Sequence, residues 1–168
     1  MYNRDMLSEK EICLRLNRKT ADSSQYTYAV MVTDRILTLL IFASYPISLA
    51  VLFMRRDSSL LRCILVPALF LLLVSLFREA FSRKRPFETM ADVIPLIAKE
   101  RPGRSMPSRH VFSAAAVAMV VMKVNPAAGM FALLFAAVLA VCRVCAGVHY
   151  ISDVLAGFAI GIISGFLL

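Results

Sequence analysis

The sequence has few charged residues for its length. Asp, Glu, Lys and Arg make up 18% of its 168 residues, whereas 60% are hydrophobic. Soluble domains are roughly half apolar, so this composition argues against an ordinary soluble protein. The excess lies in uncharged runs at 37–54, 63–77, 111–122, 124–142 and 154–168. Several approach the roughly 20 residues that cross a bilayer as a helix. We therefore expect an all-α integral membrane bundle of about five transmembrane helices, near 33–54, 60–79, 108–123, 128–146 and 150–168.

Cysteine is also scarce, with four residues in the chain. Cys142 and Cys145 form a Cys-x-x-Cys pair, but the sequence has no second pair that would complete a zinc site. The four cysteines form no disulfide framework, and we interpret them as small apolar packing residues. The sequence predicts no metal and no cofactor.

The N-terminal part has no short apolar core followed by small residues, so we expect no cleaved signal peptide. The stretch 8–20 has two interpretations. It forms either a short interfacial helix with Ile12 and Leu16 on one side, or a solvated tail. We divide the chain into a polar tail at 1–32 and a membrane domain at 33–168.

The net charge of +8 is concentrated in one place. Eight of the nineteen Lys and Arg residues lie within 78–109, between two membrane segments, and no surface of interleaved aromatic and basic residues accompanies them. We therefore expect no nucleic-acid partner but an anionic group near the membrane plane. The same region holds the long connection 83–107, whose length favours a functional loop, with a short interfacial helix over 92–100.

Three clusters of polar residues flank the apolar runs. They are Arg78 with Arg85, then Ser108 with Arg109 and His110, then Arg143 with His149 and Asp153. Counting passes through the membrane places all three at the same end of the bundle. On the last helix Gly157, Gly161 and Gly165 follow Asp153 at intervals of four, and Ala114 and Ala118 follow His110 in the same way, which predicts close helix packing.

The residue types in these clusters suit a phosphoryl group. The planar guanidinium of arginine matches phosphate oxygens, and a helix N-terminus near Ser108 adds hydrogen-bond donors. Of the two histidines, His149 is spaced to pair with Asp153, which would hold one ring nitrogen as N–H and leave the other to attack phosphorus. His110 would then protonate the leaving oxygen.

Each of these residues also has a plainer interpretation. Arginines beside membrane helices are commonly interfacial anchors, and we prefer that interpretation for Arg83, Lys84 and Arg104. A histidine at a helix end is commonly a satisfied interfacial residue, and Asp153 or Ser152 would cap the last helix. The joint occurrence of both histidines at one membrane face, each beside an arginine cluster or an acid, favours a catalytic site.

The three clusters resemble the signature of the type 2 phosphatidic acid phosphatase (PAP2) superfamily. That signature is Lys-x6-Arg-Pro, Pro-Ser-Gly-His and Ser-Arg-x5-His-x3-Asp. The chain has Arg78-x6-Arg85-Pro86, Pro107-Ser108-Arg109-His110 and Cys142-Arg143-x5-His149-x3-Asp153, in the same order. Three positions depart from it: Arg78 replaces lysine, Cys142 replaces serine, and Arg109 replaces the glycine that lets backbone approach a phosphate.

The resemblance implies a metal-independent lipid phosphatase with a phosphohistidine intermediate. His149 would be the nucleophile, Asp153 its orienting partner and His110 the acid. The phosphate would be bound by Arg78, Arg85, Ser108 and Arg143. Arg109 would add a charge for a diphosphate or a neighbouring headgroup, narrow the site, or point away from it. The substrate would be phosphatidic acid, phosphatidylglycerophosphate or a polyprenyl diphosphate, and the membrane a bacterial plasma membrane.

Orientation and two rival functions stay open at this point. Arg55, Arg56 and Arg62 flank the first short connection, which favours a cytoplasmic position for it and an outward-facing site. The basic residues of the N-terminal tail argue the other way. The rival functions are a lipid phosphotransferase with the same site and a non-catalytic membrane protein that binds anionic lipid. Soluble vanadium haloperoxidases share the signature, but the membrane segments argue against them.

Overall fold

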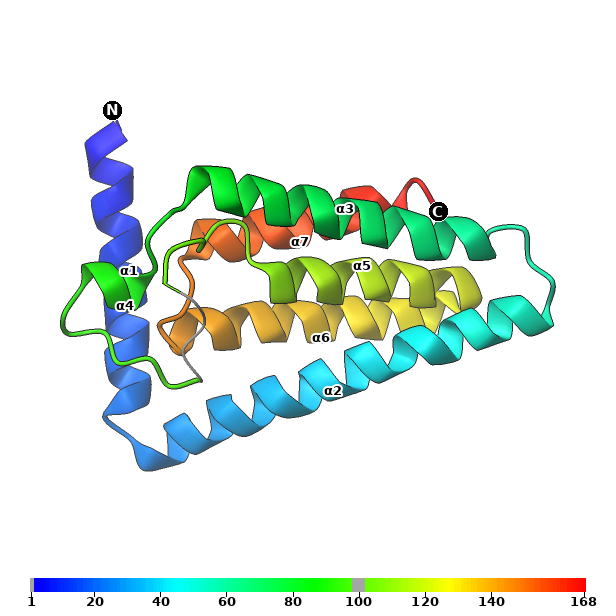
Figure 1. Cartoon of the computed structure of the whole chain (residues 1–168). Helices are drawn as coiled ribbons and strands as arrows, with labels where there is room; N and C mark the ends of the chain where they lie inside the picture. Colours follow the sequence, from blue (N-terminus) through cyan, green and yellow to red (C-terminus); the bar gives the residue numbers. More distant parts are fainter. Residues whose placement is uncertain (1, 98–101) are drawn as a thin grey trace.

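The computed structural model describes residues 2–97 and 102–168, which form seven α-helices. They are α1 (Tyr2–Ala21), α2 (Ser24–Met54), α3 (Leu60–Phe81), α4 (Pro86–Thr89), α5 (Arg109–Val124), α6 (Pro126–Cys145) and α7 (Ile151–Gly165). Five of them, α2, α3, α5, α6 and α7, run lengthwise in one bundle (Figure 1). Helices α2, α3 and α6 are long and apolar enough to cross a membrane. The predicted all-α membrane bundle is confirmed.

The predicted helices match the observed ones closely, with one large difference at the start of α2. This helix begins at Ser24 rather than near residue 33, so the polar residues after Ser23 extend the membrane helix. The Ser23 hydroxyl accepts a hydrogen bond from the backbone N–H of Tyr26, which satisfies one of the donors at the helix N-terminus. Pro46 and Pro67 lie inside α2 and α3, as membrane helices tolerate.

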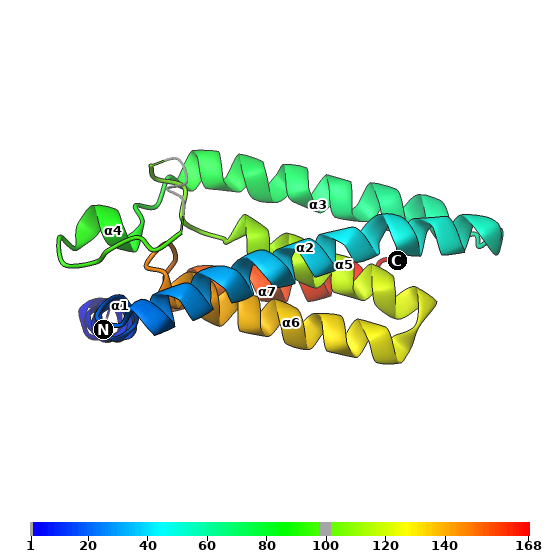
Figure 2. The ribbon, with the colours of Figure 1, turned by 90° about the horizontal axis from the view of Figure 1, so that it is seen from below.

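Helix α5 is the centre of the bundle, where it contacts α2, α3, α6 and α7 (Figure 2). The glycines of α7 allow its close approach to α5. A Cβ atom on Gly157 would lie 2.5 Å from the carbonyl oxygen of Ser108, and one on Gly161 would lie 2.5 Å from Cβ of Ala115. The predicted close packing is confirmed, with these glycines against Ser108 and Ala115 of the α5 region.

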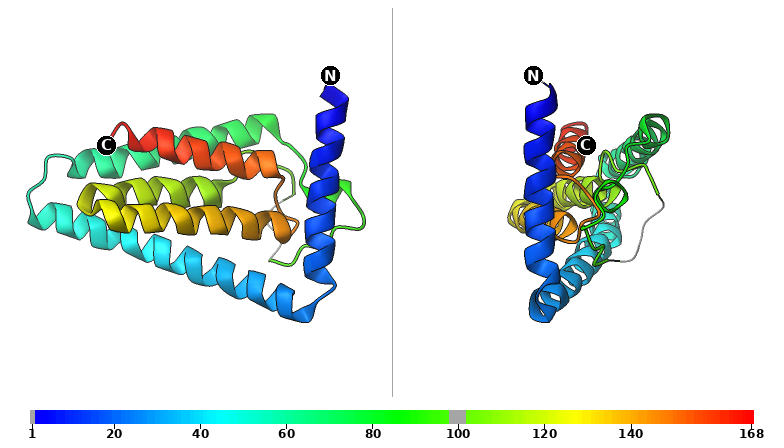
Figure 3. Two further views of the ribbon diagram at one scale, coloured as in Figure 1. Left: turned by 180° about the vertical axis from the view of Figure 1, so that it is seen from behind. Right: turned by 90° about the vertical axis from the view of Figure 1, so that its left-hand side faces the viewer.

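Helix α1 crosses the end of the bundle instead of running along it (Figure 3). Of its two predicted forms, the helix is the one observed, and the side that carries Ile12 and Leu16 faces away from the bundle. Ile12 and Leu16 are 45% and 37% exposed, whereas Cys13 and Asn17 are fully buried against the bundle. The side chain of Asn17 bonds both the N–H and the carbonyl of Ile94, and it also donates to the carbonyl of Cys145.

The connection between α3 and α5 returns over the same end of the bundle. Its short helix α4 begins at Pro86, whose fixed φ and missing N–H suit the first helical position. The helix expected over 92–100 is wrong for residues 92–97, which form a turn and irregular backbone, and the remainder lies outside the described residues. Asn17 supplies hydrogen bonds to the backbone N–H and carbonyl of Ile94, which in a helix would have been paired within the helix.

Candidate active site

His149 and Asp153 lie side by side at the end of the bundle that α1 covers. His149 belongs to the turn before α7 and Asp153 to the first turn of that helix, and both side chains are fully buried. His149 Nδ1 is 3.6 Å from Asp153 Oδ2, so the pair predicted from the spacing is present. The same oxygen accepts the backbone N–H of Tyr150 at 2.9 Å, so the carboxylate also caps the helix.

The other ring nitrogen of His149 faces Arg85. Nη1 of Arg85 is 3.4 Å from His149 Nε2 and donates to the carbonyl of Val148 at 2.8 Å. Arg85 is 1% exposed and precedes α4, and its Nε donates to the carbonyl of Gly103. A fixed, buried guanidinium beside Nε2 favours an anion at that position.

Two residues that contact Asp153 were not predicted as site residues. The hydroxyl of Ser105 donates to Asp153 Oδ2 and lies 3.4 Å from His149 Nδ1. Arg83 forms an ion pair with Asp153, with 2.7 Å between Nη1 and Oδ1. Nη1 of Arg83 also donates to the hydroxyl of Ser152, and its guanidinium carbon is 4.4 Å from the centre of the Tyr150 ring. The anchor interpretation is therefore wrong for Arg83.

Arg104, by contrast, lies at the surface and pairs with Glu79, as expected of an interfacial residue. Residues 83–85 are three consecutive cations, and their different contacts become visible only in the folded loop. The sequence did not mark Ser105 as a site residue, because serine is common in loops.

Ser108 ends the loop that leads into α5, and Arg78 lies beside this loop. Arg78, near the end of α3, donates to the carbonyl oxygens of Ser105 and Pro107 and so fixes the path of this loop. Ser108 is fully buried, and its backbone N–H donates to the carbonyl of Asp153 at 2.9 Å. Its hydroxyl has no hydrogen-bond partner among the described residues. A buried hydroxyl of this kind calls for an explanation, and a bound oxyanion is one.

Arg109 and His110 begin α5 and face a neighbouring cavity. Arg109 is exposed and His110 half-buried, and both line a cavity of ≈ 290 Å³. The other lining residues are Phe42, Leu71, Ser75 and Ser113. The structure thus places His110 at the wall of this cavity.

Arg143 lies near the end of α6 and is buried against α2. Its Nε is 2.8 Å from Asp34 Oδ1, and its Nη2 is 3.2 Å from Asp34 Oδ2. Both residues line a second cavity, of ≈ 670 Å³, which shares Phe42 with the first. Sequence reasoning missed Asp34, although an acidic residue in a membrane helix is costly and needs a partner.

Known proteins share both the sequence pattern and the fold of this chain. The sequence model of the PAP2 superfamily matches residues 59–168. Among solved structures, LpxE of Aquifex aeolicus is 27% identical over 93% of this chain and 91% of that chain, with a TM-score of 0.73. The first transmembrane PAP2-type phosphatidylglycerolphosphate phosphatase from Bacillus subtilis is 24% identical over 98% of this chain and 84% of that chain, with a TM-score of 0.78, a likeness of fold. No curated protein matches the sequence.

Proposed function

Because this chain belongs to the PAP2 superfamily, we propose that it hydrolyses a lipid phosphate or diphosphate in the membrane, without a metal, through a phosphohistidine on His149. The observation that carries this proposal is the environment of the imidazole. Nδ1 of His149 faces the carboxylate of Asp153, and Nε2 faces the guanidinium of Arg85. The carboxylate favours the tautomer with the proton on Nδ1, which leaves the lone pair of Nε2 for attack on phosphorus.

The reaction then has two steps. Nε2 of His149 forms a bond to phosphorus while the bond from phosphorus to the lipid oxygen breaks, and His110 gives that oxygen its proton. Water next attacks the phosphohistidine, gives a proton back to His110 and releases inorganic phosphate, which restores the free imidazole. Arg78, Arg85, Ser108 and Arg143 would hold the phosphoryl oxygens. Arg109, at the rim of the adjacent cavity, would contact a second phosphate or the lipid headgroup.

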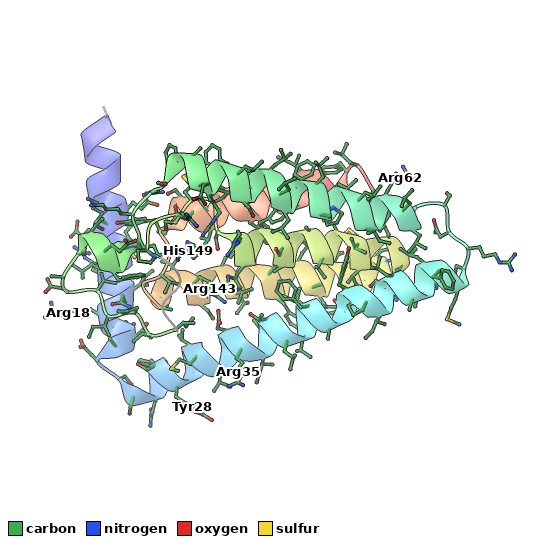
Figure 4. All side chains as sticks on the ribbon, viewed as in Figure 1. Arg18, Tyr28, Arg35, Arg62, Arg143 and His149 are labelled. Atoms are coloured by element: carbon green, nitrogen blue, oxygen red, sulfur yellow. The ribbon has the colours of Figure 1, made fainter. Side chains whose placement is uncertain are left out.

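The membrane would be a bacterial plasma membrane, with the site at its outer face. Arg62 lies at the end of the bundle opposite His149 (Figure 4). With Arg55 and Arg56 it makes the α2–α3 connection basic, and such connections favour the cytoplasmic side. An accessibility assay on cysteines introduced at Asp57 and Thr89 would test this, because only the outer position reacts with an impermeant thiol reagent in intact cells.

The function itself is tested by phosphate release in detergent. Phosphatidic acid, phosphatidylglycerophosphate and undecaprenyl diphosphate would be offered separately, with a chelator present and no acceptor other than water. We expect the wild type to release phosphate from at least one of them and His149→Ala to lose at least ~1,000-fold in kcat, as enzymes do without their nucleophile. Equal release by both proteins would exclude His149 as the nucleophile. Turnover that requires an added acceptor would indicate a phosphotransferase instead.

A further inference from the structure

One face of α1 touches the catalytic end of the bundle at three points, one helical turn apart. Glu9 Oε1 accepts the backbone N–H of Ser152 at 2.7 Å, and Sγ of Cys13 lies 3.9 Å from the carbonyl oxygen of His149. Asn17, on the next turn, bonds the backbone of Ile94 and Cys145. Residues spaced by four share a helix face, so this face is fitted to the loops that carry the site.

Glu9 also continues a chain of charges that ends at the imidazole. Its Oε2 is 3.1 Å from Nη2 of Arg83, and Nη1 of Arg83 is 2.7 Å from Oδ1 of Asp153. The other carboxylate oxygen, Oδ2 of Asp153, faces His149. The side chains of Glu9 and Arg83 are only 16% and 20% exposed, so solvent screens the chain weakly.

The planar guanidinium of Arg83 gives this chain a fixed geometry. Its two terminal nitrogens bond two different carboxylates, and rotating the plane to improve one contact would worsen the other. Glu9 therefore constrains the plane of Arg83, and Arg83 constrains Oδ1 of Asp153, beside the bonds that Ser105 and Tyr150 make to Oδ2. Because a carboxylate is rigid, fixing Oδ1 also fixes the oxygen that faces Nδ1 of His149.

We propose that Glu9 and Arg83 are positioning residues for the His149–Asp153 pair, which makes α1 part of the catalytic apparatus. The inference rests on the proposed role of His149 as the nucleophile. It differs from a purely structural role, in which the same ion pair would only fasten α1 to the bundle and would leave the imidazole unchanged.

Kinetics provide the first test, with phosphatidic acid as the probe. Glu9→Gln keeps the shape of the side chain and removes its charge, and Glu11→Gln makes the same change at an exposed position two residues on. We expect Glu9→Gln to lower kcat about tenfold and to change KM by less than twofold, because misplacing a reacting group acts on the chemical step. Glu11→Gln should match the wild type. A change confined to KM, or no change in Glu9→Gln, would overturn the proposal.

A pair of variants tests whether the two residues act as one unit. Arg83→Lys keeps the positive charge but loses the fork that bridges both carboxylates. We expect kcat of Arg83→Lys to fall about as far as that of Glu9→Gln, and the double variant to fall by less than a further twofold, since coupled residues are not additive. If the double variant instead loses kcat by the product of the two single losses, Glu9 and Arg83 act independently, which would contradict the proposal.

Histidine spectroscopy tests the proposal without turnover. The chain has two histidines, so ¹⁵N labelling of imidazoles gives two sets of resonances, which His110→Asn assigns. We expect Glu9→Gln to shift the resonances of His149 and to leave those of His110 in place. Unshifted His149 resonances would overturn the proposal even in a sample that releases no phosphate. An inactive wild type with shifted His149 resonances would instead overturn the proposed function and keep this inference.

Discussion

The carboxylate of Asp34 holds the guanidinium of Arg143 through two of its nitrogens, at 2.8 Å from Nε and 3.2 Å from Nη2. Asp34 belongs to α2 and Arg143 to α6, so this buried pair joins two membrane helices beside the site. The two-point contact fixes the plane of the guanidinium. A phosphoryl group that reaches Arg143 would therefore meet it in one orientation.

Removing one member of this pair should destabilise the protein. Asp34→Asn keeps the volume but removes the charge that pairs with the buried Arg143, and losing one partner of a buried pair costs roughly 3–5 kcal/mol. We expect a clearly lower melting temperature in detergent, partly restored in Asp34→Asn/Arg143→Gln, where no unpaired charge is buried. Arg35→Gln, at the exposed neighbouring position, is the control. Equal melting temperatures for Asp34→Asn and Arg35→Gln would contradict this.

The two histidines should respond differently to the leaving group of the substrate. If His110 is the acid, His110→Asn should be strongly impaired on a lipid phosphate, whose alkoxide needs a proton, and much less impaired on p-nitrophenyl phosphate, whose phenolate leaves without one. His149→Ala should be inactive on both because no nucleophile remains. Single-turnover rates on the two substrates measure the difference. A uniform loss in His110→Asn would assign that residue to binding rather than proton transfer.

A single methyl group on Gly157 should disturb the junction of α5 and α7. The added Cβ would lie 2.5 Å from the carbonyl oxygen of Ser108, and backbone at that distance must move. Overpacking of this kind costs roughly 1–3 kcal/mol, so Gly157→Ala should melt several degrees below the wild type. Ala159→Val enlarges an exposed position of the same helix and should melt like the wild type. The reverse order would mean that the two helices are not in close contact here.

The thiol of Cys13 should be inert while α1 is docked. Burial, together with the nearby carboxylates of Glu9 and Asp153, raises the pKa of the Cys13 thiol to about 12. At pH 8 the reactive thiolate is then a fraction on the order of one in ten thousand. Iodoacetamide followed by peptide mass spectrometry should find Cys13 unmodified in the folded protein and modified after denaturation. Rapid modification in the folded protein would show that α1 leaves the bundle.

The sequence was sufficient for the parts of the fold that depend on local pattern. Uncharged runs located the five lengthwise helices to within a few residues at most ends, because the membrane imposes both length and composition. The pairing of His149 with Asp153 was also predictable, since a spacing of four residues fixes neighbours at the start of a helix. The start of α2 was misjudged because Ser24 and its successors are polar enough to look like tail.

Contacts between distant parts of the chain could not be predicted in the same way. Arg83 reaches Asp153 across a sequence separation of 70 residues, and its neighbours Lys84 and Arg85 carry the same charge. Arg83 and Arg85 point into the site while Lys84 is exposed, and this difference depends on the path of the loop after α3. The contact face of α1 was likewise invisible, because it consists of Cys13 and Asn17 rather than the more hydrophobic Ile12 and Leu16.

The side chain of Asn17 pairs with both the N–H and the carbonyl of Ile94, as the backbone of a neighbouring strand would. Together with Glu9 and Asp34 it lies before residue 59, where the match to the family begins. The region matched by the family model is thus smaller than the region whose side chains contact the candidate site. A protein trimmed to residues 59–168 would keep all three signature clusters. It would lose Glu9, which pairs with Arg83, and Asp34, which pairs with Arg143. Helices α1 and α2, which precede the family match, thus supply carboxylates that pair with two arginines within it.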